Sequence, residues 1–127
     1  MKFLEMRHEL IETLKALSDR EYQQLAWVQK KFPGGIEYDE FDCAVHFLFD
    51  DTHLAENPED YIGYCIKSKQ EAQLILTVTR SIDRLLSELG NDLSDLEYIS
   101  SPLWEEVVRS AKQAYKAIKA NSVDLME

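Results

Sequence analysis

Carboxylates are the most distinctive chemical feature of this sequence, because they are concentrated in two runs. From Glu37 to Asp60 there are nine Asp and Glu residues and no Lys or Arg. From Asp83 to Glu106 there are seven acids against one cation, Arg84, which leaves a net charge of −6. Carboxylates at this density can coordinate a metal ion, act as a general acid and base, or bind a cationic partner.

A metal site has one main candidate in the sequence. Asp42, His46 and Asp50 recur every four residues and would share one face of a helix. Two-metal helical bundles repeat a Glu-x-x-His motif on paired helices, and the sequence has no second copy. The 50–56 segment lacks the residue order and the glycine of a calcium-binding loop, and His8 with its two neighbouring glutamates belongs to an ordinary surface helix. We therefore expect no metal, with His46 packed and hydrogen-bonded to Asp42, Asp50 or backbone.

Nucleophilic catalysis has no support in the sequence. There is no Gly-x-Ser-x-Gly motif, no glycine-rich phosphate loop and no Cys–His signature. Cys43 and Cys65 form no Cys-x-x-Cys pair, so we expect two inert free thiols in or near the core. The sequence therefore predicts a protein that is not an enzyme, with no catalytic residue and no cofactor.

Overall charge and hydropathy limit the classes of partner and the cellular location that we expect for this protein. The 127 residues carry a net charge of −10, which argues against direct binding to nucleic acid or to an anionic membrane, since both are polyanions. No apolar run approaches the ~18 to 20 residues needed to span a bilayer. The first nine residues lack the apolar core of a secretory signal, so we expect a cytoplasmic protein.

Helix-start signals recur along the chain and favour an all-α fold. They comprise capping-box patterns, an acid before an apolar run, and caps followed by proline. Their first residues are Ser18, Asp39, Asn57, Ser68, Ser94 and Ser101. We predict a single compact bundle of five or six helices over residues 1–121, followed by a frayed tail over 122–127.

Apolar residues recur three and four positions apart, as they do on the buried faces of helices. The predicted core positions are Leu10, Leu14, Leu17, Leu25, Val28, Phe32, Ile75, Val78, Ile82, Leu85, Leu89, Trp104, Val107, Ala111, Ala114 and Ile118. Segment 41–49 fits either a buried helix or a strand with alternating apolar residues. We favour the helix because acids surround its start; a strand would make the fold α+β.

The first acidic run gives the predicted binding surface. Acids near helix starts complement the helix dipole, but this does not explain why 24 residues contain no balancing cation. A purely solvated acidic face remains the alternative to a face that binds a basic protein. We assign partner binding to these acids and to two tyrosines that could anchor a partner within a charged rim. The assigned residues are Tyr38, Asp39, Asp42, Asp50, Asp51, Glu56, Glu59, Asp60 and Tyr61.

The motifs in segments 38–52, 54–58, 62–64, 97–99 and 101–104 resemble a family of small bacterial proteins, some of which are associated with the immunity proteins of contact-dependent growth inhibition. This resemblance implies a cytoplasmic protein that binds and neutralises a cognate toxin domain, commonly a nuclease. The basic groove of a nuclease would suit an acidic inhibitor. The alternatives are an acidic adaptor of a basic cellular protein and, less favoured, a carboxylate–histidine metal protein; the oligomeric state is open.

Overall fold

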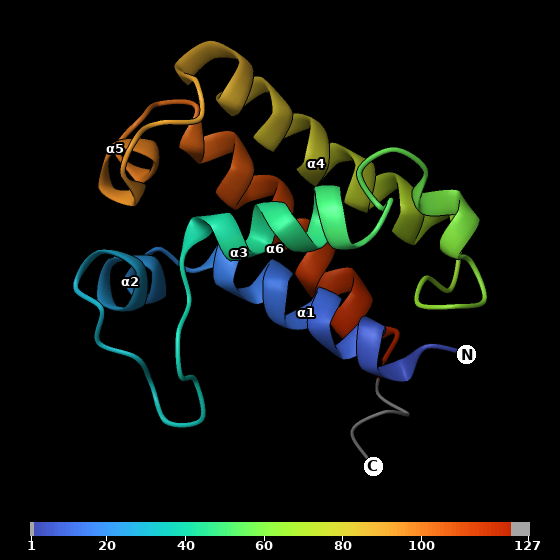
Figure 1. Ribbon diagram of the computed structural model, residues 1–127. Coiled ribbons are helices and arrows are strands. Elements are labelled where there is room, and N and C mark those ends of the chain that lie inside the picture. Colours follow the sequence, from blue (N-terminus) through green and yellow to red (C-terminus); the bar gives the residue numbers. More distant parts are fainter. Residues whose placement is uncertain (1, 123–127) are drawn as a thin grey trace.

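The computed structural model describes residues 2–122, and these form six α-helices and no strand, as predicted (Figure 1). Three long helices make the body: α1 (Leu4–Ser18), α4 (Lys69–Leu89) and α6 (Trp104–Ala120). Helix α6 packs against both α1 and α4. None of the helices in the described range is long and apolar enough to cross a membrane.

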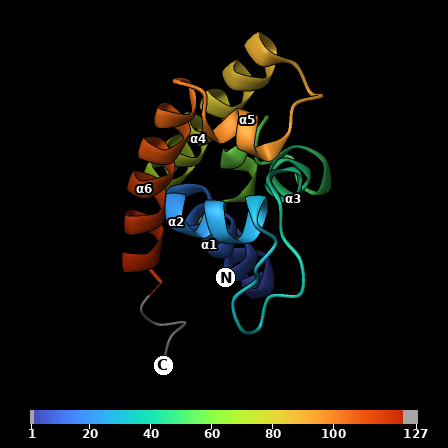
Figure 2. The same ribbon diagram turned by 90° about the vertical axis from the view of Figure 1, so that its left-hand side faces the viewer.

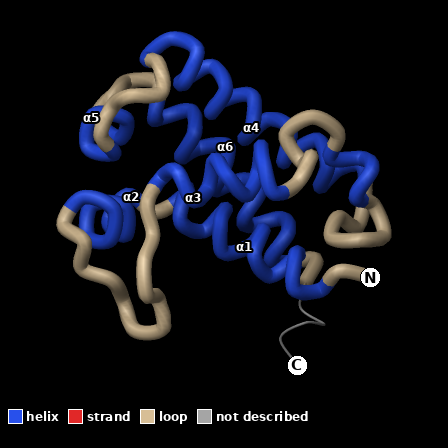
Figure 3. The backbone as a smooth tube through the Cα atoms, viewed as in Figure 1, coloured by secondary structure: helices blue, strands red, loops and turns tan. Residues whose placement is uncertain are grey.

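Shorter helical segments complete the fold around this body. They are α2 (Arg20–Tyr22), which runs into a π-helical turn η1 (Gln23–Val28); α3 (Phe41–Val45), which runs into a π-helical turn η2 (His46–Asp51); the 3-10 turn η3 (Pro58–Tyr61); and α5 (Asp95–Ile99). Figure 3 shows the long loop between η1 and α3 projecting from the body, as the tan segment below α2.

The predicted choice of a helix for segment 41–49 is confirmed, but its predicted cap is wrong. The Asp39 side chain does not cap α3; instead, Asp95 of α5 accepts a hydrogen bond from the backbone N–H of Phe41 at 3.0 Å. The start of α3 is therefore capped by a residue distant in sequence. This contact fixes α5 beside α3.

Two of the local capping signals act as predicted. The Ser68 side chain accepts a hydrogen bond from the N–H of Glu71 at the start of α4, and Ser94 with Glu97 forms a complete capping box on α5. Helix α4 ends at Gly90, whose φ of 84° suits glycine. The signal at Ser18 is displaced by one residue, because Asp19 caps α2 and the Ser18 hydroxyl donates back to the Lys15 carbonyl.

Three of the four predicted apolar stripes lie in the core. The stripes of α1 and α6 are fully buried, as is that of α4 apart from the half-buried Leu89. The stripe over 25–32 is only partly right: Leu25 is exposed, and Val28 and Phe32 are half-buried. The residues that η1 buries are Gln23, Ala26 and Trp27. The π-helical turn shifts the helical register there, so a period of 3.6 residues selects the wrong face.

An aromatic cluster joins α6 to the shorter segments. The Trp104 ring lies 5.9 Å from Trp27 and 5.1 Å from Phe41, and Phe41 lies 5.2 Å from Tyr98. Each polar ring atom of the cluster is satisfied, for example by the 2.9 Å hydrogen bond from Trp104 Nε1 to Gln23 Oε1. The cluster holds η1, α3 and α5 at one end of the bundle, which faces the viewer in Figure 2.

At the opposite end of the bundle, a buried ion pair ties the ends of the long helices together. Arg7 of α1 forms two parallel hydrogen bonds to the Glu71 carboxylate, at 2.9 and 3.0 Å. The same guanidinium donates to the Cys65 and Ile118 carbonyls and to the Ser122 hydroxyl. Ser122 is thus buried and bonded, which contradicts its predicted place in a frayed tail; residues 123–127 of that tail lie outside the described range.

Candidate functional site

A groove of about 1020 Å³ opens at the end of the bundle that carries the aromatic cluster. Its walls come from η1, from α3 and η2, from the last turns of α4, and from α5 with the loop before it. Three cluster rings, Trp27, Phe41 and Tyr98, form part of its lining and are themselves buried. The groove therefore rests on a rigid aromatic base.

Carboxylates from both acidic runs line this groove. Glu40 and Asp42 come from the first run, and Asp83 and Asp95 come from the second. Lys30 is the one Lys or Arg among the described residues that line it, so four negative charges face one positive charge, a net of −3. Two segments separated by some forty residues of sequence thus build a single acidic site.

Lys30 is held at the mouth of the groove by the loop that follows it. Its Nζ lies 3.8 Å from Glu40 Oε2 and 5.4 Å from the centre of the Tyr38 ring. The Tyr38 hydroxyl donates to Glu40 Oε2 at 2.6 Å, and this hydrogen bond raises the pKa of Tyr38 to about 12. Lys30 also has a φ of 58°, a left-handed conformation that non-glycine residues adopt uncommonly.

Asp95 is a half-buried carboxylate of the groove. Burial raises the pKa of Asp95, and the nearby charges of Glu40 and Asp39 act in the same direction, while the Phe41 N–H and Lys30 oppose them. Asp95 therefore takes up a proton more readily than a free aspartate does as the pH falls.

Of the sequence-predicted residues, Asp42 and Asp50 lie with His46 on one exposed face of the α3–η2 helix. His46 Nε2 is 3.1 Å from Asp42, and His46 Nδ1 is 2.8 Å from Asp50. The predicted proximity of His46 to both aspartates is confirmed, but the predicted packing is wrong, because the His46 side chain is 56% exposed. The ring lies between the carboxylates and directs its two nitrogens to different ones, and residues 2–122 contain no group of His, Cys, Asp and Glu suited to a metal.

The other residues of the predicted surface lie outside the acidic groove. Asp51, Glu56, Glu59 and Asp60 are exposed along the end of η2, the following loop and η3, and none of them lines the acidic groove. Tyr38 is exposed in the projecting loop, whereas Tyr61 is half-buried and its hydroxyl accepts a hydrogen bond from the His53 N–H at 2.9 Å. The structure thus brings Asp42 to the groove but not the acids near η3.

Asp39 has a structural environment and not the exposed position expected of a binding residue. Its Oδ2 accepts hydrogen bonds from the Tyr22 hydroxyl at 2.6 Å and from Trp27 Nε1 at 2.9 Å. Burial and the bond to Asp39 raise the pKa of Tyr22. Asp39 therefore joins the start of the α3 segment to η1 and supports the aromatic base of the groove.

We expect Asp39→Ala to lower the free energy of unfolding by about 1–3 kcal/mol, because it leaves the N–H of the buried Trp27 side chain without an acceptor. Urea unfolding followed by tryptophan fluorescence measures the change. Asp42→Ala removes an exposed carboxylate of the same type and should shift stability by no more than about 0.5 kcal/mol. Equal stability of the two variants would refute the structural assignment of Asp39.

Asp42 is the one residue of the predicted surface among the described residues that line the groove; those that the sequence analysis did not assign include Lys30, Glu40, Asp83, Asp95 and Leu96. The second acidic run was visible in the sequence and gave a signal for Asp83 and Asp95. Nothing in the sequence placed the two runs beside each other, because their proximity depends on the Asp95–Phe41 hydrogen bond and on the aromatic cluster.

The two thiols occupy different environments. Cys65 is buried, and burial raises its pKa to about 11, so it is an inert core residue as expected. Cys43 is exposed on α3, which contradicts its expected position in or near the core. It faces a second groove between α1, the projecting loop and α3, and its pKa is also raised, chiefly by burial of the sulfur.

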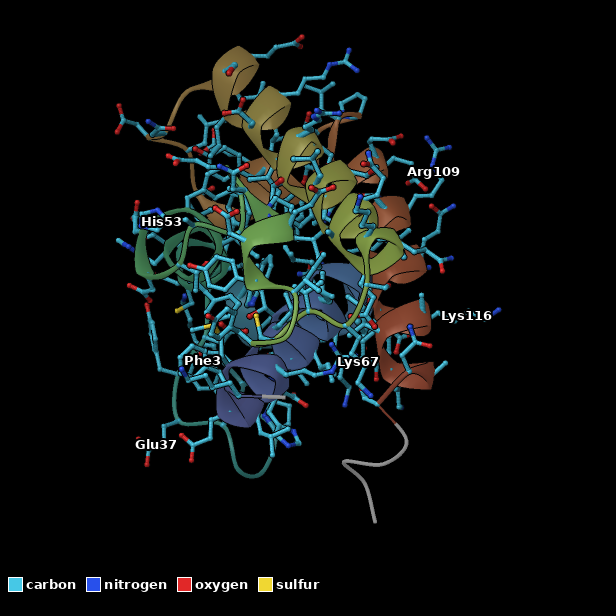
Figure 4. The ribbon with its side chains drawn as sticks, turned by 90° about the vertical axis from the view of Figure 1, so that its right-hand side faces the viewer. Phe3, Glu37, His53, Lys67, Arg109 and Lys116 are labelled. Atoms are coloured by element: carbon cyan, nitrogen blue, oxygen red, sulfur yellow. The ribbon has the colours of Figure 1, made fainter. Side chains whose placement is uncertain are left out.

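Helix α6 carries a group of exposed cations. Figure 4 shows Lys67, Arg109 and Lys116 on the side of α6, whereas Glu37 and His53 lie on the other side of the molecule. Four exposed cations lie on α6: Arg109, Lys112, Lys116 and Lys119. None of these four cations lines the acidic groove, so they do not offset its negative charge locally, and the groove would attract a basic molecule over a distance.

Comparison with known proteins gives one match. No curated protein and no solved structure matches the chain. A family model described as a domain of unknown function, DUF7945, matches residues 1–125, which is nearly the whole sequence. The acidic groove, its aromatic base and the helices that hold them therefore lie within that domain, and the chain belongs to the DUF7945 family.

Proposed function

We propose that this protein is a binding protein that recognises a basic protein partner through its acidic groove and the adjoining α3–η2 face. The observation that supports the proposal is the meeting of both acidic runs at one groove with a single lysine among its lining residues. Like charges held this close repel one another and lower stability, so their concentration favours a use outside the fold.

We further propose that the partner is a toxin domain, which the protein neutralises without chemistry of its own. This identity rests on the motif resemblance described above, and the acidic groove gives it a physical mechanism. A nuclease toxin presents a basic groove to its nucleic acid. An acidic protein that occupies this groove excludes the substrate, and electrostatic attraction increases the association rate by ~10- to 10³-fold at low salt.

The experiment expresses this protein together with the toxic domain encoded beside its gene. We expect growth to be restored and the purified proteins to form a stable complex that weakens as salt is raised. A toxin from an unrelated system of the same activity is the control, and it should remain toxic. If the neighbouring domain remains toxic and does not bind, the immunity role is excluded.

The same experiment separates the toxin proposal from the adaptor alternative. An adaptor would bind a basic cellular protein whether or not a toxin is present, and deleting its gene would not sensitise cells to a toxin. We expect deletion to make cells sensitive to contact with toxin-producing neighbours. Normal growth of the deletion strain beside such neighbours would favour the adaptor.

A further inference from the structure

We propose that the groove accepts one amphipathic helix of the partner, with apolar side chains on its inner face and Lys or Arg on its edges. This inference deepens the proposed function and rests on it. Beyond its acids, the groove has an apolar floor contributed by different segments. Its exposed or half-buried members are Val28, Val45, Phe49, Leu86, Leu93 and Leu96.

The geometry of the floor suits a helix. Val45 and Phe49 are four residues apart on the α3–η2 helix and both line the groove, so they form one apolar ridge. Leu96, which is 49% exposed, lies on the short helix α5 at the other wall. An amphipathic helix docks into such a groove through side chains spaced three and four residues apart.

The charge of the groove favours a peptide segment over a small molecule. Sites for small molecules are mostly apolar clefts of about 300–1,000 Å³ with few polar groups. This groove has a volume of about 1020 Å³, and four carboxylates surround its floor. Those carboxylates would match cations spread along a helix, while the apolar floor would exclude a fully polar cationic chain.

Lys30 shows that the acidic rim attracts an ammonium group. Its Nζ lies at Glu40 although its own backbone must adopt a left-handed conformation there. We infer that Lys30 occupies a position that a cation of the partner takes on binding. Asn tolerates a positive φ better than other non-glycine residues, so Lys30→Asn removes the charge without adding backbone strain.

The probes are two synthetic peptides of Lys and Leu with identical composition and about 16 residues each. One has the leucines in helical register, and the other is scrambled. We expect the amphipathic peptide to bind at least about tenfold more tightly, with amide shift changes at 45–49 and 93–98 in NMR spectra. Lys30→Asn should tighten binding of both peptides, by about threefold.

Leu96→Asn should weaken the amphipathic peptide about tenfold and leave the scrambled peptide unchanged, because only the former buries an apolar face. Leu4→Asn is the matched control, since Leu4 is similarly exposed at 44% but lies outside the groove. Equal binding of both peptides, or shift changes centred on 56–60, would overturn helix docking while leaving electrostatic binding of a basic partner intact. Failure of both peptides to bind would count against the proposed function as well.

Discussion

Glu71→Gln should lower the free energy of unfolding by about 3–5 kcal/mol, the largest stability effect expected of any single substitution in this protein. The variant leaves the guanidinium of Arg7 charged and buried without its carboxylate. Arg7 and Glu71 are both fully buried, so neither side chain can recover hydration by a small movement. Denaturant unfolding at pH 7, followed by circular dichroism, measures the loss.

The Glu71 carboxylate is held by more than the arginine. It also accepts hydrogen bonds from the Lys67 N–H at 2.8 Å and from Asn121 Nδ2 at 2.9 Å. Burial raises the pKa of Glu71, but the hydrogen bonds from Arg7, Lys67 and Asn121 outweigh burial, so its pKa is lowered. One carboxylate therefore joins the start of α4 to α1 and to the end of α6.

Because the pKa of Glu71 is lowered, the stability that the ion pair contributes decreases as the pH falls. The folded protein binds the Glu71 proton less tightly than the unfolded chain does, so the ion pair contributes its full stability above the unfolded pKa of about 4.3. That contribution is lost as the pH falls from there through the lowered folded pKa. Glu71→Gln lacks this group, so the wild-type advantage should shrink below about pH 4.

Two control variants distinguish a buried pair from an exposed one. Glu105→Gln breaks the exposed pair that Glu105 forms with Arg20 at 2.7 Å, and it should cost less than about 1 kcal/mol. The double variant Arg7→Met with Glu71→Leu removes both charges and should recover much of the stability lost in Glu71→Gln. If Glu71→Gln lowers the free energy of unfolding no more than Glu105→Gln does, the buried pair does not stabilise the fold as proposed.

The sequence allowed the helical class and most of the core to be predicted because those features are local. The stripes of α1, α4 and α6 keep a regular period, and Ser68 and Ser94 cap the helices that they immediately precede. The period failed at 25–32, where a π-helical turn changes the register. The Arg7–Glu71 pair could not be predicted, since a charged residue within a helix pattern is usually exposed.

The candidate site was predictable only in its composition. The sequence marked both acidic runs, but a run says nothing about which members reach the surface together. Asp39 turns inward to Tyr22 and Trp27, and the acids near η3 lie outside the groove, while Asp83 and Asp95 join Asp42 across the fold. These outcomes depend on tertiary hydrogen bonds and ring packing, which no spacing rule encodes.

Substituting carboxylates of the groove should slow association with the partner more than substituting the same number of carboxylates elsewhere on the protein. The groove variant Glu40→Gln, Asp42→Asn, Asp83→Asn removes three of the four carboxylates and spares Asp95, which caps α3. We expect its association rate with a catalytically inactive form of the neighbouring toxin domain to fall at least about tenfold at low salt, with a flatter salt dependence. Stopped-flow fluorescence over a salt series measures both quantities.

The matched variant Glu56→Gln, Glu59→Gln, Asp60→Asn removes the same three charges from exposed acids outside the groove. It reduces the net negative charge of the protein by the same amount, so any difference between the two variants reports where the charges lie. We expect an association rate within about threefold of wild type, because attraction is strongest where carboxylates surround a low-dielectric cleft. A larger loss in this variant than in the groove variant would transfer the binding surface to the acids at and before η3, which are part of the surface that the sequence analysis assigned.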